Sequence, residues 1–196
     1  MITKPAITAE KIHDIIQNRW SPRAFDASKT ITEDVLHALL EAARWAPSCM
    51  NEQPWRFLVC NKAQNEASWE SLLGCLAEKN QQWAMNAPLL LMAVAMNTFN
   101  QNQKPNRWAA YDTGAASLNL CLQATAMGLV THQMGGFDTD QCIQRFNLPD
   151  GCTPLSVIAV GYQSDIDCLN DEFKQRELAE RSRAALTERF YFGCWG

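Results

Sequence analysis

The run Leu89–Met96 (LLLMAVAM) constrains the fold of this chain more than any other stretch. Every residue in it is apolar, and Asn86 and Pro88 punctuate the chain just before it. A strand with one wet face alternates apolar and polar residues, so this uninterrupted run predicts a central strand covered on both faces. The run is too short to cross a bilayer, which takes about 20 apolar residues.

Other elements are predicted on both sides of this strand from the spacing of apolar residues. Thr8 is expected to cap a helix that buries Ile12 and Ile15, and Thr32 to cap a second helix. Further helices are predicted at residues 63–78, 109–127, 138–146 and 171–183, with Asp138 in a capping box and small residues throughout 109–127. Strands are predicted at residues 55–60, 129–134, 154–160 and, in the apolar tail, 190–195.

Two polar stretches are candidate binding segments. Between Pro47 and Pro54 the chain turns from helix to strand through Ser48, Cys49, Met50, Asn51, Glu52 and Gln53. Such a corner can present donors and acceptors to a flat polar ligand, or it can be an ordinary loop. Arg19, Ser21 and Arg23 form a possible phosphate cradle, because guanidinium forks match phosphate oxygens. A solvated helix end is the alternative interpretation of these arginines.

Charge and cysteine content exclude several classes of protein. The net charge of −4 and the pI near 5.4 argue against a nucleic-acid surface, which needs a clustered basic face. No apolar leader is evident, so the 8 cysteines are interpreted as reduced, packed thiols in a cytoplasmic protein. None of the 3 histidines is spaced from a cysteine as zinc ligands are, so no metal site is expected. No G-x-G-x-x-G occurs, so a Rossmann pocket for NAD(P)H is not expected.

Four motifs occur in an order that resembles the FMN-dependent nitroreductase family. They are Arg19-x-Ser21-x-Arg23-x-Phe25, Ala46-Pro47-Ser48-x-x-Asn51-x-Gln53-Pro54-Trp55, Gly135-Gly136-Phe137-Asp138 and Arg181-Ser182-Arg183. The likeness extends from Ile12 to the C-terminus. It implies an α+β fold with a mixed central β-sheet flanked by helices, forming one domain over residues 1–196. It further implies a homodimer that exchanges C-terminal arms, about residues 184–196, with two FMN sites in the interface. The helix at 109–127 would pack tightly in that interface.

The resemblance also implies a role for individual residues. Arg19 and Ser21 would hold the FMN phosphate and ribityl chain, with the backbone of Trp20 nearby, and Arg181 and Arg183 would complete the phosphate clamp. Arg23 would lie beside N1 and O2 of the ring and raise the flavin potential; no catalytic side chain is expected beyond the flavin. The opposite subunit would contribute the residues Pro47, Ser48, Cys49, Met50, Asn51 and Gln53. Backbone N–H groups of Gly135 or Gly136 would reach N5 or O4.

Some residues in or near these motifs have simpler interpretations. Cys49 stands where a second small polar residue is more usual, and a packed thiol is the alternative to a flavin contact. Trp45, Trp55 and Phe57 are expected in the core, and His132 is expected to be structural and hydrogen-bonded.

The activity implied is a ping-pong reaction in which NADH or NADPH gives hydride to FMN and an electron-poor acceptor then removes it. The acceptor would be a nitroaromatic, a quinone or a similar compound. A narrower oxidoreductase on the same fold, with residues 98–108 as a substrate lid, is one alternative. A non-catalytic flavin-binding protein is another, and a flavin-free dimeric interaction module is a third.

Overall fold

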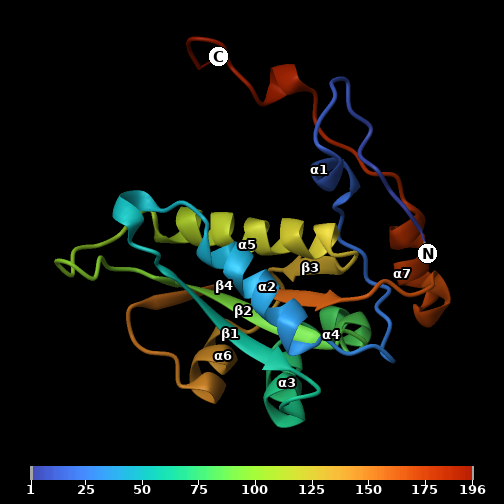
Figure 1. Ribbon diagram of the computed structural model, residues 1–196, viewed down its shortest axis with the longest axis horizontal. Helices are drawn as coiled ribbons and strands as arrows, with labels where there is room; N and C mark the ends of the chain where they lie inside the picture. Colours follow the sequence, from blue (N-terminus) through green and yellow to red (C-terminus); the bar gives the residue numbers. More distant parts are fainter. Residues whose placement is uncertain (1, 196) are drawn as a thin grey trace.

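A four-stranded sheet forms the centre of the computed structural model, which describes residues 2–195 (Figure 1). The strands are β1 (Trp55–Asn61), β2 (Leu89–Met96), β3 (Val130–Met134) and β4 (Cys152–Gly161), in the order β1-β2-β4-β3. The α+β class predicted from the sequence is confirmed. The expectation of a mixed sheet is wrong, because all three strand pairings described within residues 2–195 are antiparallel.

Strand β2 is the central element, and its predicted bounds are confirmed. Successive side chains of a strand point to opposite faces. Leu90 and Met92 accordingly belong to one hydrophobic core, whereas Leu89 and Leu91 belong to the other. The sheet therefore separates two cores, each covered by helices.

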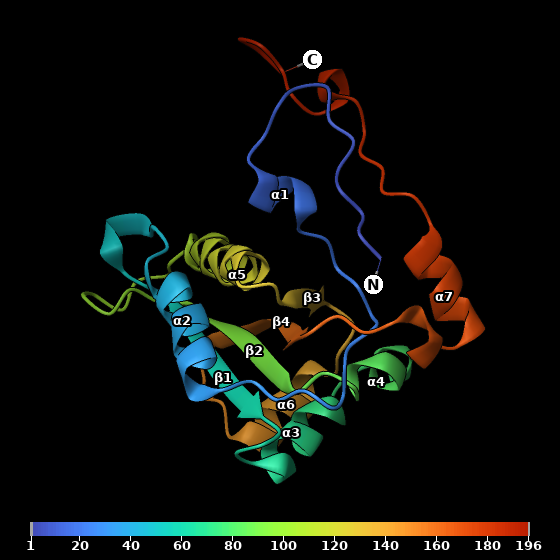
Figure 2. The ribbon, with the colours of Figure 1, turned by 45° about the vertical axis from the view of Figure 1, so that its right-hand side comes forward.

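One face of the sheet is covered by α2 (Glu33–Arg44) and α5 (Ala109–Ala126), which lie beside each other in both views (Figures 1 and 2). Helix α2 begins as predicted at Thr32, whose hydroxyl accepts the N–H of Val35 at 3.4 Å. Its residues Leu36 and Leu39 are buried against the sheet. An amphipathic helix with a good N-cap thus forms this layer.

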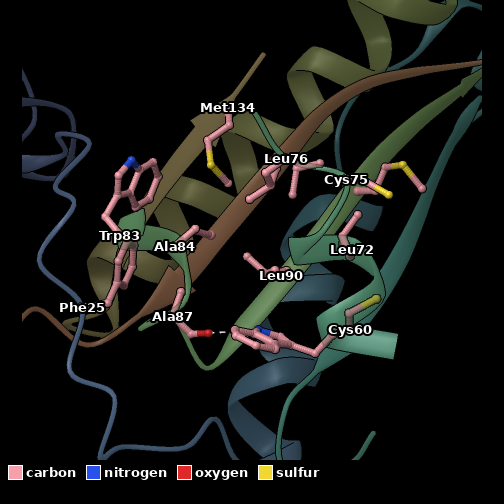
Figure 3. Packing of buried hydrophobic residues seen from close by; sticks show 14 of the residues in the cluster. Phe25, Cys60, Leu72, Cys75, Leu76, Trp83, Ala84, Ala87, Leu90 and Met134 are labelled. Atoms are coloured by element: carbon pink, nitrogen blue, oxygen red, sulfur yellow. Dashed lines mark hydrogen bonds between the residues drawn. The ribbon is translucent and has the colours of Figure 1, made fainter. Parts of the chain in front are cut away.

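The other face is covered by α3 (Glu66–Leu73), α4 (Glu78–Ala84) and α6 (Thr139–Phe146) (Figure 1). Phe25 and Trp83 stack there with ring centroids 6.1 Å apart, and Figure 3 shows them side by side. The indole of Trp69 donates to the carbonyl of Ala87 at 3.0 Å, so this buried N–H keeps a partner. The 3-10 helix η2 (Ile166–Cys168) and α7 (Asp171–Leu178) follow β4 and add Phe173 to the same core.

Three predicted helices begin or end elsewhere. Helix α1 (Asp14–Asn18) is capped by His13, not by Thr8, because the chain before it is extended and hydrogen-bonded to Gln17. The stretch 63–78 is interrupted after α3, where Leu76 forms an isolated bridge with Phe137. The helix predicted over 171–183 already ends at Leu178 in α7, and the next residue is extended.

The C-terminal tail does not form the strand predicted at residues 190–195. It contains a 3-10 helix η3 (Leu186–Glu188), and every residue from 182 to 195 is exposed. Phe192 is 94% and Trp195 87% exposed. A strand needs a hydrogen-bonded neighbour, and the protomer offers this segment none. The exchange of an arm over residues 184–196 stays a prediction, and Gly196 lies outside the described residues.

Candidate functional site

A cavity of about 240 Å³ brings together residues from the two ends of the chain. It lies between the segment that follows α1 and the C-terminal end of α7, where the N-terminal segment also passes (Figure 2). Of the residues expected to bind a cofactor, Arg19, Trp20, Ser21, Arg23, Arg181 and Arg183 line it. The remaining charged side chains of its lining are Lys4, Arg176, Glu177 and Glu180. We call this the arginine cavity.

Glu177 fixes the backbone of the arginine segment. Its side chain is 1% exposed, and its Oε1 accepts the N–H groups of Arg23 and of Ala24, the latter at 3.0 Å. Within residues 2–195, no donor reaches its Oε2. Sequence reasoning missed Glu177; the available signal was its position four residues after buried Phe173, on the same face of α7.

Arg181 joins three segments of the chain at the cavity. Its guanidinium donates to the carbonyl of Lys4, to that of Gln17 at 3.0 Å and to that of Arg19 at 3.0 Å. Burial lowers its pKa, and the nearby Arg19 and Arg183 guanidinium groups lower it further. Much of its donor capacity is therefore used to hold the cavity wall, a role that the sequence did not predict.

The remaining predicted arginines give the cavity its chemistry. Arg19 Nη1 donates to Ser21 Oγ at 3.4 Å. The Arg23 guanidinium carbon lies 6.0 Å from the centre of the Trp83 ring. Burial lowers the Arg23 pKa, the Glu177 carboxylate opposes this effect and Arg176 adds to it. Partly desolvated guanidinium groups that face one cavity suit an anion with several acceptor oxygens.

His132 on β3 contacts the segment that carries Arg19 and Arg23. Its Nδ1 is 3.0 Å from the carbonyl of Pro22, and its ring is 4.5 Å from that of Trp83. Burial lowers its pKa to about 4, the hydrogen bond to Pro22 opposes the shift, and Arg23 and Arg19 add to it. A carbonyl can only accept, so the neutral ring carries its proton on Nδ1. As expected, this histidine is structural and hydrogen-bonded.

The proline-flanked corner is a tightly held turn around the 3-10 helix η1 (Cys49–Asn51). Met50, Asn51 and Gln53 have φ angles of 54°, 56° and 53°, which are uncommon for residues with side chains. The N–H of Gln53 donates to Ser48 Oγ at 3.0 Å, and that of Cys49 to Asp112 Oδ2 at 3.0 Å. Local backbone strain that neighbouring residues hold in place is common at binding sites.

The corner and the arginine cavity lie at opposite ends of the protomer in both views (Figures 1 and 2). One protomer thus does not bring Pro47, Ser48, Cys49, Met50, Asn51 and Gln53 to the arginines.

Gly135 and Gly136 follow β3 and are exposed, and neither lines the arginine cavity. A Cβ added at Gly135 would meet nothing within 4 Å, so its backbone is open to approach. The carbonyl of Gly136 accepts from Ala77 N at 2.9 Å and Asn80 Nδ2 at 3.0 Å.

Two expectations about packing are wrong. Trp45 is 71% exposed rather than in the core, because it follows the last turn of α2 and its indole donates to Glu41 on the surface. Trp55 is buried as expected and Phe57 half-buried. Cys168 and Cys194 are exposed, whereas the other thiols are buried or half-buried. The 3-10 helix and the tail that carry these two residues present them to solvent.

The segment proposed as a lid, residues 98–108, is attached to the corner. The N–H of Asn100 donates to Glu52 Oε1 at 2.7 Å, and Thr98 forms an isolated bridge with Pro105. One side-chain hydrogen bond therefore joins this segment to the corner.

The arginine cavity fits the phosphate end of FMN. Guanidinium groups and the Ser21 hydroxyl supply donors for a phosphate, and the buried Glu177 Oε2 is an acceptor without a protein donor in the described chain. A phosphorylated polyol carries both the acceptors and the hydroxyl donors that match this set.

No cluster of three or more potential metal ligands occurs among residues 2–195. None of the helices described for these residues is long and apolar enough to cross a membrane.

Comparison with known proteins identifies the family. A crystal structure described as "the oxidoreductase containing FMN" superposes with a TM-score of 0.90 at 32% identity, covering 97% of this chain and 96% of that one. An FMN complex from Exiguobacterium sibiricum 255-15, provisionally named a nitroreductase, has a TM-score of 0.74, covers 95% and 99% of the two chains and, at 22% identity, shows a shared fold. YdgI of Bacillus subtilis (strain 168), provisionally named an NAD(P)H nitroreductase, is 26% identical over 188 residues, 78% of this chain and 88% of that protein. Since the sequence profile of the Nitroreductase family also matches residues 16–162, this chain belongs to the nitroreductase family.

Proposed function

We propose that this protein is an FMN-dependent oxidoreductase that uses NADH or NADPH to reduce an electron-poor acceptor, such as a nitroaromatic or a quinone, by a ping-pong mechanism. The observation that carries the proposal is the arginine cavity, in which the predicted phosphate-binding residues of both chain ends converge. The FMN named for two structural neighbours agrees with this assignment. When bound, FMN supplies the redox chemistry, and the protein supplies binding, orientation and electrostatics.

The size of the cavity limits what it holds. Sites that enclose a whole small ligand usually measure about 300–1,000 Å³. The arginine cavity has about 240 Å³, so it accommodates the phosphate and the adjoining chain, and the ring extends beyond it. Arg19 and Ser21 are the proposed phosphate ligands, with the backbone of Trp20 beside the ribityl chain. Arg181 and Arg183 close the cavity from the other side.

Arg23 is the proposed flavin-tuning residue. Glu177 accepts its backbone N–H, and the residue is half-buried, with its guanidinium near the Trp83 ring. A guanidinium cation in a partly desolvated site stabilises negative charge on a neighbouring group more strongly than it would in water. We therefore expect Arg23 to favour the reduced, more negative form of the ring. Gly135 and Gly136 are proposed to offer backbone donors where no side chain obstructs approach.

The second wall of the site is proposed to come from another copy of the chain, in a homodimer. The exposed face of α5 is apolar, with Tyr111 77% and Leu118 48% exposed and Gly114 between them. Next to it, a cavity of about 450 Å³ is lined mainly by apolar side chains, among them Ile16 and Trp45. Large exposed apolar patches of this kind mark interfaces. Docking along this face would let the corner, residues 47–53, reach the partner's flavin.

The proposal is tested by the absorbance of the purified protein after FMN has been added, before and after anaerobic NADH or NADPH. We expect a yellow protein whose flavin absorbance is bleached by at least one nucleotide and restored by a quinone. A colourless protein would exclude flavin binding, and bound FMN that no nucleotide bleaches would indicate a non-catalytic flavin-binding protein.

The phosphate assignment is tested by Arg19→Ala. Removal of a partly buried guanidinium leaves the phosphate without its fork, so FMN affinity should fall by about 100-fold. Fluorescence quenching of free FMN on titration with apoprotein measures it. Arg145→Ala, at an exposed position of α6 outside the cavity, serves as the control. Equal FMN affinity in the Arg19 variant and the wild type would contradict the assignment.

A further inference from the structure

The N-terminal segment, residues 2–6, is hydrogen-bonded to the rest of the chain beside the arginine cavity. Ala6 N donates to the carbonyl of Gln17 at 2.8 Å, and Gln17 Nε2 returns a hydrogen bond to the carbonyl of Ala6 at 3.2 Å. Gln163 Nε2 donates to the carbonyl of Ile2 at 2.9 Å, and Arg181 donates to that of Lys4. The segment runs beside the chain that leaves α7 in both views (Figures 1 and 2). It is thus held at its ends by Gln17 and Gln163, and in the middle by Arg181 of the cavity lining.

Lys4 is the residue of this segment that enters the cavity lining. Its Nζ donates to the carbonyl of Glu177 at 2.8 Å and to that of Ala179, and it lies 4.9 Å from the centre of the Trp20 ring. An ammonium group has three N–H donors, and the described chain supplies acceptors for two of them. One donor is therefore available to a bound ligand.

The electrostatic setting of Lys4 favours an anion. Burial lowers its pKa, the Glu177 carboxylate opposes this, and the Arg181 and Arg23 guanidinium groups add to it. Arg176 is paired with Glu172 at 2.7 Å, and Arg181 is bound to backbone carbonyls. Lys4 and Arg19 form no ion pair with a carboxylate among residues 2–195. A bound dianion would offset the repulsion that Lys4 experiences from Arg181 and Arg23.

We infer that Lys4 is a further phosphate-binding residue and that residues 2–6 form a strap over the phosphate end of the flavin site. This inference rests on the proposed function. Lys4 acts as a compact cation positioned by two carbonyls of the α7 terminus, while the Arg181 guanidinium anchors the strap backbone. The strap makes the affinity for the phosphate depend on a segment outside the family match at residues 16–162.

Binding of FMN and of riboflavin, which lacks the phosphate, distinguishes this role from a structural one. Lys4→Met keeps the length of the apolar stem and removes the charge. We expect about tenfold weaker binding of FMN and unchanged binding of riboflavin. Lys4→Arg should retain most of the FMN affinity. Lys11→Met, at an exposed position of the same N-terminal region, is the matched control and should change neither constant.

Competition by inorganic phosphate provides a readout that does not involve the ring. Phosphate should displace FMN from the wild type. After correction for the FMN affinity of each protein, the inhibition constant of phosphate should be about tenfold higher for Lys4→Met. Equal losses for FMN and riboflavin, or no loss for either, would overturn the inference. If Arg19→Ala also leaves the preference for FMN over riboflavin unchanged, the phosphate site itself is wrong. If Lys4→Met leaves this preference unchanged and Arg19→Ala reduces it, the phosphate site is correct and only the role of Lys4 and the strap is wrong.

Discussion

His132 shows how one half-buried side chain links the sheet to the arginine segment. It extends from β3 to the carbonyl of Pro22, between Ser21 and Arg23. Because burial lowers its pKa, the ring is neutral at physiological pH. Its neutral form keeps a further positive charge away from Arg19 and Arg23, which already face the cavity.

The first residue-scale prediction concerns pH. The folded protein holds His132 with a pKa of about 4, below the ordinary histidine value of 6.5, so the unfolded chain binds more protons between these values. The free energy of unfolding should therefore rise with pH through this window and fall on acidification. We expect His132→Gln to lose roughly 5 °C less in Tm than the wild type between pH 7 and pH 4.5.

Differential scanning calorimetry of both proteins at each pH measures this difference. Carboxylates such as Asp138 also have lowered pKa values and contribute a fall of the same sign, so the difference between proteins is the relevant quantity. His37→Gln, at an exposed position of α2, is the control and should follow the wild type. Parallel curves for His132→Gln and the wild type would show that His132 titrates normally.

At the scale of elements, α5 and the corner form one unit. Asp112 in the first turn of α5 is 4% exposed, and its carboxylate accepts the N–H of Cys49. The corner contains three residues with side chains at positive φ, so it needs such external support. The contact spans 63 residues of sequence.

Asp112→Ala should destabilise the protein by about 1–3 kcal/mol, because the Cys49 N–H loses its buried acceptor. Asp112→Asn keeps an amide oxygen at the same place and should recover most of that loss. Urea unfolding followed by tryptophan fluorescence measures both variants. The same free energy of unfolding in Asp112→Ala and Asp112→Asn would show that the hydrogen bond does not hold the corner.

The elements themselves followed from local sequence to different degrees. The apolar run and the caps at Thr32 and Asp138 were sufficient to predict β2 and the starts of α2 and α6, because local pattern and tertiary burial agree there. The prediction of a helix cap at Thr8 was wrong, because Ala6 exchanges hydrogen bonds with Gln17 of α1 and the chain before α1 stays extended. The tail at 190–195 has the residues of a strand but no partner in the protomer.

At the scale of the whole molecule, the exposed C-terminal tail is the feature that bears on the proposed second subunit. Leu186, Phe190, Phe192 and Trp195 are 60% or more exposed, which is costly for large apolar side chains. Burial of each such side chain contributes about 1.5–3 kcal/mol. An arm that docks on a partner would explain why the chain keeps them.

Truncation after Ala184 should weaken self-association by about 100-fold or more, because that apolar surface can no longer be buried between subunits. Size-exclusion chromatography with light scattering over a dilution series measures the dissociation constant. Thr187→Ser, a small change in the same tail, is the control. A truncated protein that stays dimeric at the same concentrations as the full chain would exclude the arm from the interface.

The sequence by itself determined the central strand, the approximate positions of most other elements and the residue types of the site. A continuous apolar run of this length between turn residues favours a doubly covered strand, and the order of arginine, proline and glycine motifs pointed to the family. Only the tertiary structure decided how these parts are held. Glu177, Lys4 and Arg181 act through hydrogen bonds between residues more than 150 positions apart, and no local pattern encodes a contact between chain ends. The separation of the corner from the arginine cavity is likewise a property of the folded protomer, because it depends on where α5 places its two ends.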